Sequence, residues 1–189
     1  ICEKALAYDV PIFIDGEESW MQDAADMLVE ELMEKYNTEK AIVFNTLQMY
    51  RHDRMNYLRK LHHNADQKKY HIGLKIVRGA YMEKERDRAE QKGYLSPICI
   101  DKKATDDNYN EAINYMMNHE KMAVFAGTHN EESSYLLLEL AKQNKIDPSD
   151  NKIPSIDVVH IMKKDITQKL NNFKKGELFN CYSAFNGFA

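Results

Sequence analysis

Four short apolar runs constrain the fold of this chain more than any other feature of its sequence. They are VPIFID at residues 10–15, KAIVFN at 40–45, IGLKIV at 72–77 and MAVFAG at 122–127. Each run has the length of a β-strand and is rich in Val, Ile or Phe. Between the runs, apolar residues recur at steps of three and four, which is the helical period. This alternation predicts an α/β fold in which crossover helices join parallel strands.

The helical segments have apolar faces and capping residues. The residues that recur with the helical period are Met21, Ala25, Leu28, Leu32 and Tyr36 in the first such segment, Tyr109, Ala112, Ile113, Met116 and Met117 in a later one, and Ser134, Leu137, Leu138 and Ala141 in the last. Ser19 and Gln22 have the spacing of a capping box, and Asn130 is predicted to be an N-cap. The pattern fits either an open doubly wound sheet or part of a (β/α)₈ barrel.

Composition excludes several classes of protein. At 189 residues and 43% hydrophobic content, the chain can bury one sizeable core, and its formal net charge of −4 is too balanced for a nucleic-acid partner. The three cysteines, Cys2, Cys99 and Cys181, are widely spaced, so neither a disulfide framework nor a thiolate metal site is indicated. The sequence shows no signal-peptide layout and no apolar run of about 18 residues, so we expect a soluble protein of a reducing compartment.

Polar residues gather at the ends of the predicted strands, where parallel α/β folds place their chemistry. The strand-end residues are Asp15, Asn45, Gln48, Lys75, Arg78, Gly79, Ala80, Tyr81, Thr128, His129 and Asn130. Acid, amide, cation, phenol and imidazole groups at successive strand ends suit a polar heterocycle bound beside a small substrate. This set predicts a binding site at one edge of the sheet.

Each of these residues also has a structural interpretation. Asp15 could cap the following helix, His129 could be a core imidazole, and Gly79 could ease a tight turn. Lys75 favours a functional role, because a lysine inside an apolar strand must be paired or face a cavity.

Other conspicuous residues favour structural roles. His62 and His63 are expected to face solvent and to form no metal pair, and the EKER run at 83–86 to form a solvated helix face. The methionines Met49, Met116 and Met117 are expected to fill the core.

Five motifs resemble the proline dehydrogenase family, in the order in which that family carries them. They are IFIDGEESW at 12–20, LQMY at 47–50, LKIVRGAYMEKER at 74–86, DKKATDDNYN at 101–110 and GTHNEES at 127–133. The resemblance covers residues 5–153 and implies a (β/α)₈ TIM-type barrel that holds FAD at the carboxyl ends of its strands. It also implies oxidation of L-proline to 1-pyrroline-5-carboxylate by hydride transfer to flavin N5, a step of proline catabolism toward glutamate.

The resemblance assigns roles to individual residues. It implies that Asp15, Lys75 and Tyr81 take part in catalysis: Asp15 at the substrate end, Lys75 near flavin N5, and Tyr81 beside the proline ring. The FAD-binding residues that it implies are Gly16, Gln48, Lys75, Val77, Gly79, Ala80, Lys102, Thr128, His129 and Asn130. Among these, Gln48 would bind the flavin ring and Lys102 the adenine-nucleotide half. A metal is not implied. The implied electron acceptor is a quinone, which suggests a cytoplasmic protein associated peripherally with the inner membrane.

The chain also departs from the family pattern. We expect residues 1–153 to form a partial barrel and residues 154–189 to be a divergent segment, because the late family motifs, including a paired arginine for the proline carboxylate, are absent. We therefore expect a truncated or altered reading of a longer gene, with little proline-oxidising activity of its own. Two alternatives stay open: a non-catalytic flavin-binding remnant or interaction protein, and a doubly wound receiver-like domain that binds Mg²⁺. The sequence leaves the oligomeric state undecided.

Overall fold

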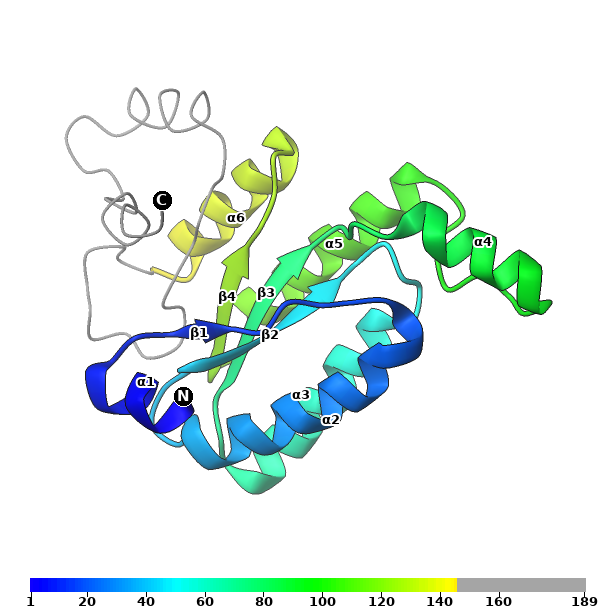
Figure 1. Ribbon diagram of the computed structural model, residues 1–189. Coiled ribbons are helices and arrows are strands. Elements are labelled where there is room, and N and C mark those ends of the chain that lie inside the picture. The colour runs from blue at the N-terminus through cyan, green and yellow to red at the C-terminus, as the bar shows by residue number, and fades with distance from the viewer. Residues whose placement is uncertain (146–189) are drawn as a thin grey trace, which may run out of the picture.

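The computed structural model describes residues 1–145, which alternate between strands and helices (Figure 1). The elements in chain order are α1 (Cys2–Tyr8), β1 (Ile12–Phe13), α2 (Ser19–Tyr36), β2 (Val43–Gln48), α3 (Arg54–Lys68), β3 (Ile72–Val77), α4 (Met82–Lys92), α5 (Lys102–Met117), β4 (Met122–Ala126) and α6 (Glu131–Gln143). The predicted divergent segment, residues 154–189, and the last residues of the predicted barrel region lie outside the described residues. The four apolar runs each supply a strand, as predicted.

The strands form one parallel sheet whose order, β1-β2-β3-β4, follows the chain. A doubly wound sheet reverses its strand order at a switch point, whereas a (β/α)₈ barrel adds each strand beside its predecessor. The structure therefore confirms the α/β fold with parallel strands and crossover helices, and the order supports the barrel over the open sheet. All four strands end at the same edge, so the residues that follow them are brought together.

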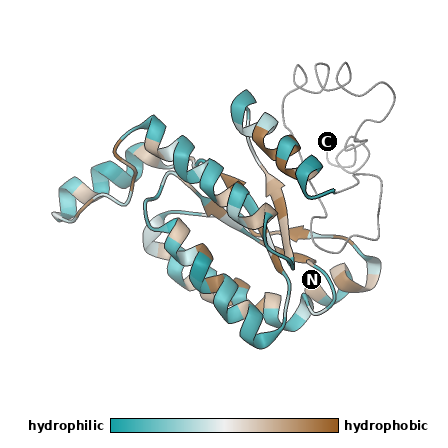
Figure 2. Ribbon diagram, turned by 180° about the vertical axis from the view of Figure 1, so that it is seen from behind, coloured by the Kyte–Doolittle hydropathy of each residue, from teal (hydrophilic) through white to brown (hydrophobic). Residues whose placement is uncertain are grey.

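Side chains of the strands alternate between two faces. One face packs against α2, α3, α5 and α6 and forms the main core, in which Leu47, Leu74 and Val124 are fully buried. The other face carries Phe44, whose ring lies 4.8 Å from that of Phe13. The strands are apolar and the outer surfaces of the helices polar (Figure 2). Burial of each large apolar side chain contributes about 1.5–3 kcal/mol.

Helix α2 packs on a face other than its apolar stripe. Met21 and Leu28, on the predicted apolar face, are exposed, so they contribute little to the core. The residues that α2 buries are Gln22, Asp26, Val29 and Met33. A hydrogen-bonded network satisfies the two polar ones, because Asp26 accepts from Gln22 (2.8 Å) and from Arg54 of α3 (2.7 Å). Polar residues that are paired in this way can occupy a buried helix face.

Of the two capping predictions one is right and one is wrong, and the predicted core methionines are buried. Asn130 caps α6, since its side chain accepts from the backbone N–H of Ser133 (3.0 Å), as predicted. The capping box at Ser19 is wrong: α2 begins at Ser19 and Glu18 is the N-cap. The three methionines predicted to fill the core, Met49, Met116 and Met117, are all buried.

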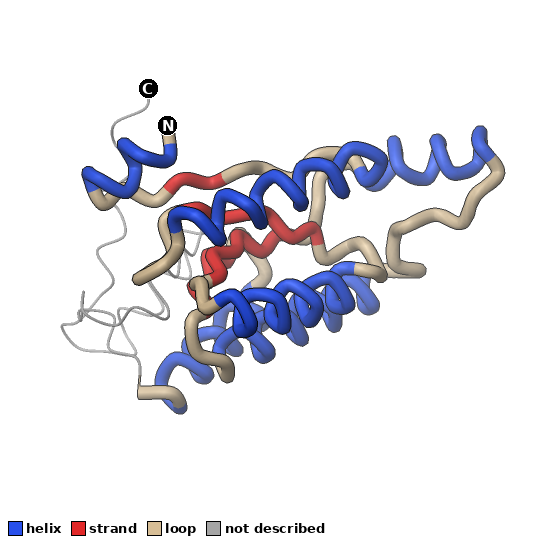
Figure 3. The backbone as a smooth tube through the Cα atoms, turned by 90° about the horizontal axis from the view of Figure 1, so that it is seen from below, coloured by secondary structure: helices blue, strands red, loops and turns tan. Residues whose placement is uncertain are grey.

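The solvent-facing prediction is wrong for two residues. His62 is half-buried, and its Nδ1 lies 2.8 Å from the hydroxyl of Tyr115 on α5. Glu85 lies on α4, which projects from the sheet at its carboxyl edge (Figures 1 and 3), yet this carboxylate is fully buried. In the described part of the chain, no helix has the length and apolarity needed to cross a membrane.

Candidate functional site

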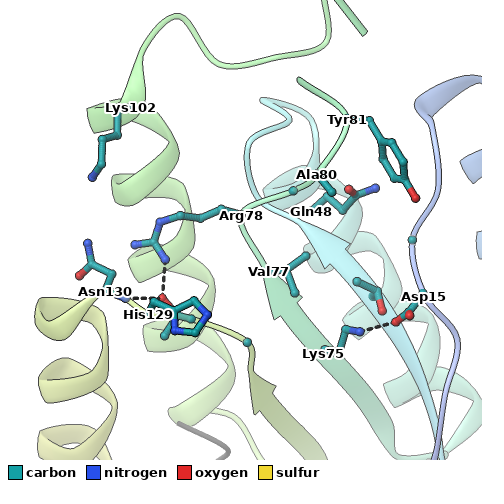
Figure 4. Close-up of a pocket in the computed structure, with 15 residues that line it drawn as sticks. Asp15, Gln48, Lys75, Val77, Arg78, Ala80, Tyr81, Lys102, His129 and Asn130 are labelled. Carbon is teal, nitrogen blue, oxygen red and sulfur yellow. Dashed lines mark hydrogen bonds and ion pairs between the residues drawn. The ribbon is translucent and has the colours of Figure 1, made fainter. Parts of the chain in front are cut away.

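A pocket of about 670 Å³ opens at the carboxyl edge of the sheet (Figure 4). Its lining residues are Asp15, Gly16, Thr46, Gln48, Lys75, Val77, Arg78, Gly79, Ala80, Tyr81, Lys102, Gly127, Thr128, His129 and Asn130. Every residue to which the family resemblance assigned a role is among them, whereas Asn45 of the strand-end set is buried and does not line the pocket. Thr46, Arg78 and Gly127 also line the pocket without an assigned role, and each lies in or directly after a predicted strand.

An ion pair between Lys75 and Asp15 lies on one wall of the pocket (Figure 4). Lys75 projects from β3 and Asp15 follows β1, so the pair crosses β2, which lies between them. The Lys75 side chain is 22% exposed and that of Asp15 is 71% exposed, so the pair faces the open pocket. Thr46, the register partner of Lys75 on β2, donates its hydroxyl to the carbonyl of Ile14 (2.8 Å). This bond fixes the end of β1 beside the pair.

Gln48 ends β2 and is held in one orientation. Its amide nitrogen donates to the backbone carbonyl of Glu17 (2.7 Å), and its side chain is almost fully buried. A Cβ atom at Gly16 would lie 3.0 Å from that same nitrogen. The absence of a side chain at Gly16 therefore lets Gln48 reach the loop after β1.

The loop after β3 exposes its backbone to the pocket. Gly79 has φ +134°, and a Cβ atom there would lie 2.6 Å from the ring of Tyr50. Tyr81, two residues on, donates its hydroxyl to Glu17 (2.9 Å), and this hydrogen bond raises the pKa of the Tyr81 phenol. The loop thus offers bare backbone at Gly79 and Ala80, followed by an aromatic ring.

Arg78 links the loops after β3 and β4 to α5. Its guanidinium donates to Asp106 (2.6 Å), Thr128 (2.7 Å) and Ser133 (3.0 Å), and it lies 4.3 Å from the ring centre of Tyr109. The sequence offered one signal for this role, because Asp106 and Thr128 lie in two of the five family-like motifs and each can accept a hydrogen bond.

Asp106 lies between two cations, Arg78 and Lys102. Burial alone would raise the pKa of Asp106, but hydrogen bonds from Lys102 and Arg78 lower it below its ordinary value. Lys102, at the start of α5, is largely exposed beside this carboxylate. This side of the pocket therefore carries more positive than negative charge.

The loop after β4 supplies the remaining polar groups. The Thr128 hydroxyl accepts from the backbone N–H of Asn130 (3.0 Å) as well as from Arg78. His129 is exposed at the pocket, so its interpretation as a core imidazole is wrong. No group of three or more potential metal ligands occurs within residues 1–145, and the acidic cluster that a receiver-like Mg²⁺ site needs does not form there.

Comparison with known proteins identifies the family. A family model described as "Proline dehydrogenase" matches residues 1–184. The chain is 36% identical over 151 residues to proline dehydrogenase 1, mitochondrial, of Dictyostelium discoideum, covering 76% of this chain and 26% of that protein. It is 32% identical over 164 residues to the Drosophila melanogaster protein of the same name, covering 81% and 24%. The family match extends past residue 153, and the domain boundary predicted there stays a prediction.

Solved structures agree on the fold. The structure of proline utilization A from Bdellovibrio bacteriovorus, inactivated by N-propargylglycine, superposes with a TM-score of 0.72 at 20% identity. The superposition covers 82% of this chain and 16% of that one. The chain thus spans about a quarter of the length of the curated relatives named above. The matches confirm the resemblance seen in the motifs: the chain belongs to the proline dehydrogenase family.

Proposed function

We propose that the chain forms the FAD-binding wall of a proline dehydrogenase that oxidises L-proline to 1-pyrroline-5-carboxylate. The observation that carries this proposal is the convergence of Asp15, Gln48, Lys75, Tyr81 and His129 on one pocket, from the ends of four different strands. A structural role does not require such a set, because most of these side chains remain accessible from the pocket.

The residues present fit a flavin dinucleotide. The pocket volume of about 670 Å³ lies in the range of cofactor sites. Gly79 and Ala80 expose backbone for close approach, and the cations Arg78 and Lys102 suit the phosphates of a dinucleotide. When bound, FAD would supply the hydride acceptor, its N5 atom.

The chain's own residues would position the reactants and stabilise charge. Lys75 offers a positive charge on the sheet side of the pocket, where it would stabilise negative charge that develops during the reaction. Asp15 orients the Lys75 ammonium through their ion pair. Tyr81, whose hydroxyl is held by Glu17, would flank the substrate ring, and Gln48 would bind the flavin through its buried amide. The motif resemblance further favours a quinone as the electron acceptor.

Flavin absorbance of the purified chain, with FAD added and then with L-proline under anaerobic conditions, tests the proposal. We expect FAD to bind in a stoichiometric complex. We expect L-proline, but not D-proline, to bleach the flavin absorbance slowly, in keeping with the little proline-oxidising activity expected from the sequence. A yellow complex that proline does not bleach would instead support the non-catalytic flavin-binding alternative. Failure to bind FAD would refute the proposed site.

A further inference from the structure

Glu85 is buried in a helix whose other charged residues are mostly exposed. Its residue is 0% exposed, whereas Glu83 and Glu90 of the same helix α4 lie on the surface. Both carboxylate oxygens accept hydrogen bonds from Ser19: Oε1 from the backbone N–H (2.5 Å) and Oε2 from the hydroxyl (2.6 Å). A buried carboxylate is tolerated only when its oxygens are satisfied, and here a single residue satisfies both.

Ser19 is the first residue of α2, so its N–H has no partner within the helix. A negative charge at this end of the helix also interacts favourably with the helix dipole. The bond pair joins positions 66 residues apart and therefore connects two separate β/α units. One unit carries Asp15 and Gly16, and the other carries Tyr81.

Flanking contacts connect the same two segments. They are the hydrogen bond from Tyr81 to Glu17 (2.9 Å), the ion pair of Lys84 with Glu18, and the guanidinium of Arg88 over the ring of Trp20 (4.3 Å). Together with the Glu85–Ser19 pair, these contacts are named the α2–α4 clasp. In the Lys84–Glu18 pair the lysine is 60% exposed, although Glu18 is buried, so solvent weakens this ion pair. The fully buried carboxylate of Glu85, with both oxygens bonded to Ser19, is therefore the anchor of the clasp.

Both segments of the clasp lead directly into the pocket. Residues 15–16 and 79–81 both line it, and Figure 4 shows Asp15, Gln48 and Tyr81 in the same part of the pocket. Tyr50 lies beneath Gly79. Burial raises the pKa of Tyr50 to about 12, and the negative charge of Glu85 adds to the rise.

We propose that Glu85 is a positioning residue, which holds Tyr81 against the pocket by clasping the first turn of α4 to the start of α2. The inference rests on the proposed function, because Tyr81 is placed there beside the proline ring. Glu85 touches neither cofactor nor substrate in this proposal. It keeps the loop after β1 and the loop after β3 at a fixed distance, and so positions Tyr81.

Three variants and a matched control separate the contributions of the two hydrogen bonds between Glu85 and Ser19. Glu85→Ala removes both bonds, and Ser19→Ala removes only the bond from the hydroxyl. Glu85→Gln can keep both, since its carbonyl accepts from the N–H and its amide donates to the serine oxygen. Glu90→Ala removes an exposed carboxylate from the same helix and is the control.

Two readouts follow the clasp without any turnover. The chain has a single tryptophan, Trp20, which lies inside the clasp, so acrylamide quenching of its fluorescence reports directly on this contact. With fluorotyrosine incorporated, the ¹⁹F resonance that disappears in Tyr81→Phe reports on Tyr81. In Glu85→Ala we expect Trp20 to become more accessible and the Tyr81 resonance to move toward that of the unfolded chain. Glu85→Gln and Glu90→Ala should resemble the wild type.

Kinetics then test whether the clasp affects proline oxidation. Rates are divided by the amount of bound flavin, so that a loss of folded protein does not lower them. We expect Glu85→Ala to lower kcat/KM for proline roughly tenfold, with a rise in KM, and Glu85→Gln to restore most of it. If Trp20 and Tyr81 are unchanged in Glu85→Ala, the clasp is refuted. If both respond but kcat/KM does not, the positioning role is refuted. If the wild type does not oxidise proline, the proposed function fails, and the two spectroscopic readouts still decide whether Glu85 positions Tyr81.

Discussion

Lys75 forms an ion pair with Asp15 across an intervening strand, although neither residue is adjacent to the other in the sheet. The lysine extends from β3 over β2 because side chains at its register position point to the face opposite α2, α3, α5 and α6. The pair therefore lies where the face of the sheet that carries Phe44 meets the pocket. Its charges are available to a ligand, because Asp15 is largely exposed.

Replacing Lys75 tests the charge at this junction. We expect Lys75→Met to lower the rate of flavin reduction by L-proline by about 100-fold, because a preorganised positive charge is lost. Stability should change by about 1 kcal/mol or less, since exposed ion pairs contribute little. Stopped-flow flavin absorbance measures the rate, and Lys75→Arg, which keeps the charge, is the control. A Lys75→Met protein with the wild-type rate would remove this residue from the proposed chemistry.

Gly79 should tolerate no side chain. We expect Gly79→Ala to destabilise the protein by about 3 kcal/mol, because the alanine would combine an unfavourable φ with a collision against the Tyr50 ring. Gly93 also has a positive φ, but a Cβ atom there meets nothing within 4 Å. Gly93→Ala should therefore cost only about 1 kcal/mol. Urea unfolding compares the two variants, and equal losses would show that the contact with Tyr50 is unimportant.

The buried pair of Arg54 and Asp26 should be among the most sensitive contacts to truncation. Their side chains are 6% and 5% exposed, with 2.7 Å between Arg54 Nη1 and Asp26 Oδ2. Asp26→Ala leaves the guanidinium without this partner, so we expect a loss of about 3–5 kcal/mol of unfolding free energy. Asp107→Ala breaks an exposed pair with Lys103 and should change stability by less than about 1 kcal/mol. A small loss in Asp26→Ala would mean that Asp53 alone satisfies Arg54.

Asp53 should make stability fall in acid. Burial alone would raise the pKa of Asp53, but hydrogen bonds from Arg54 and Arg51 lower it to about 2. Because the folded-state pKa lies below the unfolded value, this stabilisation is present above about pH 4 and is lost as pH falls toward 2. We expect the loss to be about 1 kcal/mol, since solvent screens a side chain that is 39% exposed.

Thermal unfolding of wild type and Asp53→Asn at several pH values measures this effect. The variant should lose less stability than the wild type between about pH 4 and pH 2. Parallel curves for the two proteins would contradict the pKa of Asp53.

The sequence predicted which segments form strands better than it predicted where each strand ends. The second apolar run ends at Asn45, yet β2 continues to Gln48. Asn45 and Thr46 stay buried because Asn45 donates to Asp26 and Thr46 to a backbone carbonyl. Hydropathy detects an apolar side chain in a core, but it cannot show that a polar one has found a partner there. The same limit explains why Asp26 on α2 was missed.

The candidate site was predicted in more detail than the helix surfaces. Strand-end positions are local in sequence, and parallel pairing brings them together, so the sequence alone could place Lys75 and His129 at one edge of the sheet. Arg78 received no individual role, because its three acceptors come from two segments that lie about 30 and 50 residues further along the chain. Glu85 was assigned to solvent, since its partner Ser19 lies in a different β/α unit. Contacts between units depend on how the units dock, and no local pattern reports that.

The sheet order has a consequence for how the protein is made. Because each strand pairs with the one synthesised just before it, a growing chain can add β2 to β1, then β3 to β2, then β4 to β3, without waiting for a distant segment. The pocket wall then emerges in the order of translation, beginning with Asp15 and finishing with Asn130. The Lys75–Asp15 pair can form only after the third strand has been added, so the ribosome has released more than half of the described residues before the two charges meet.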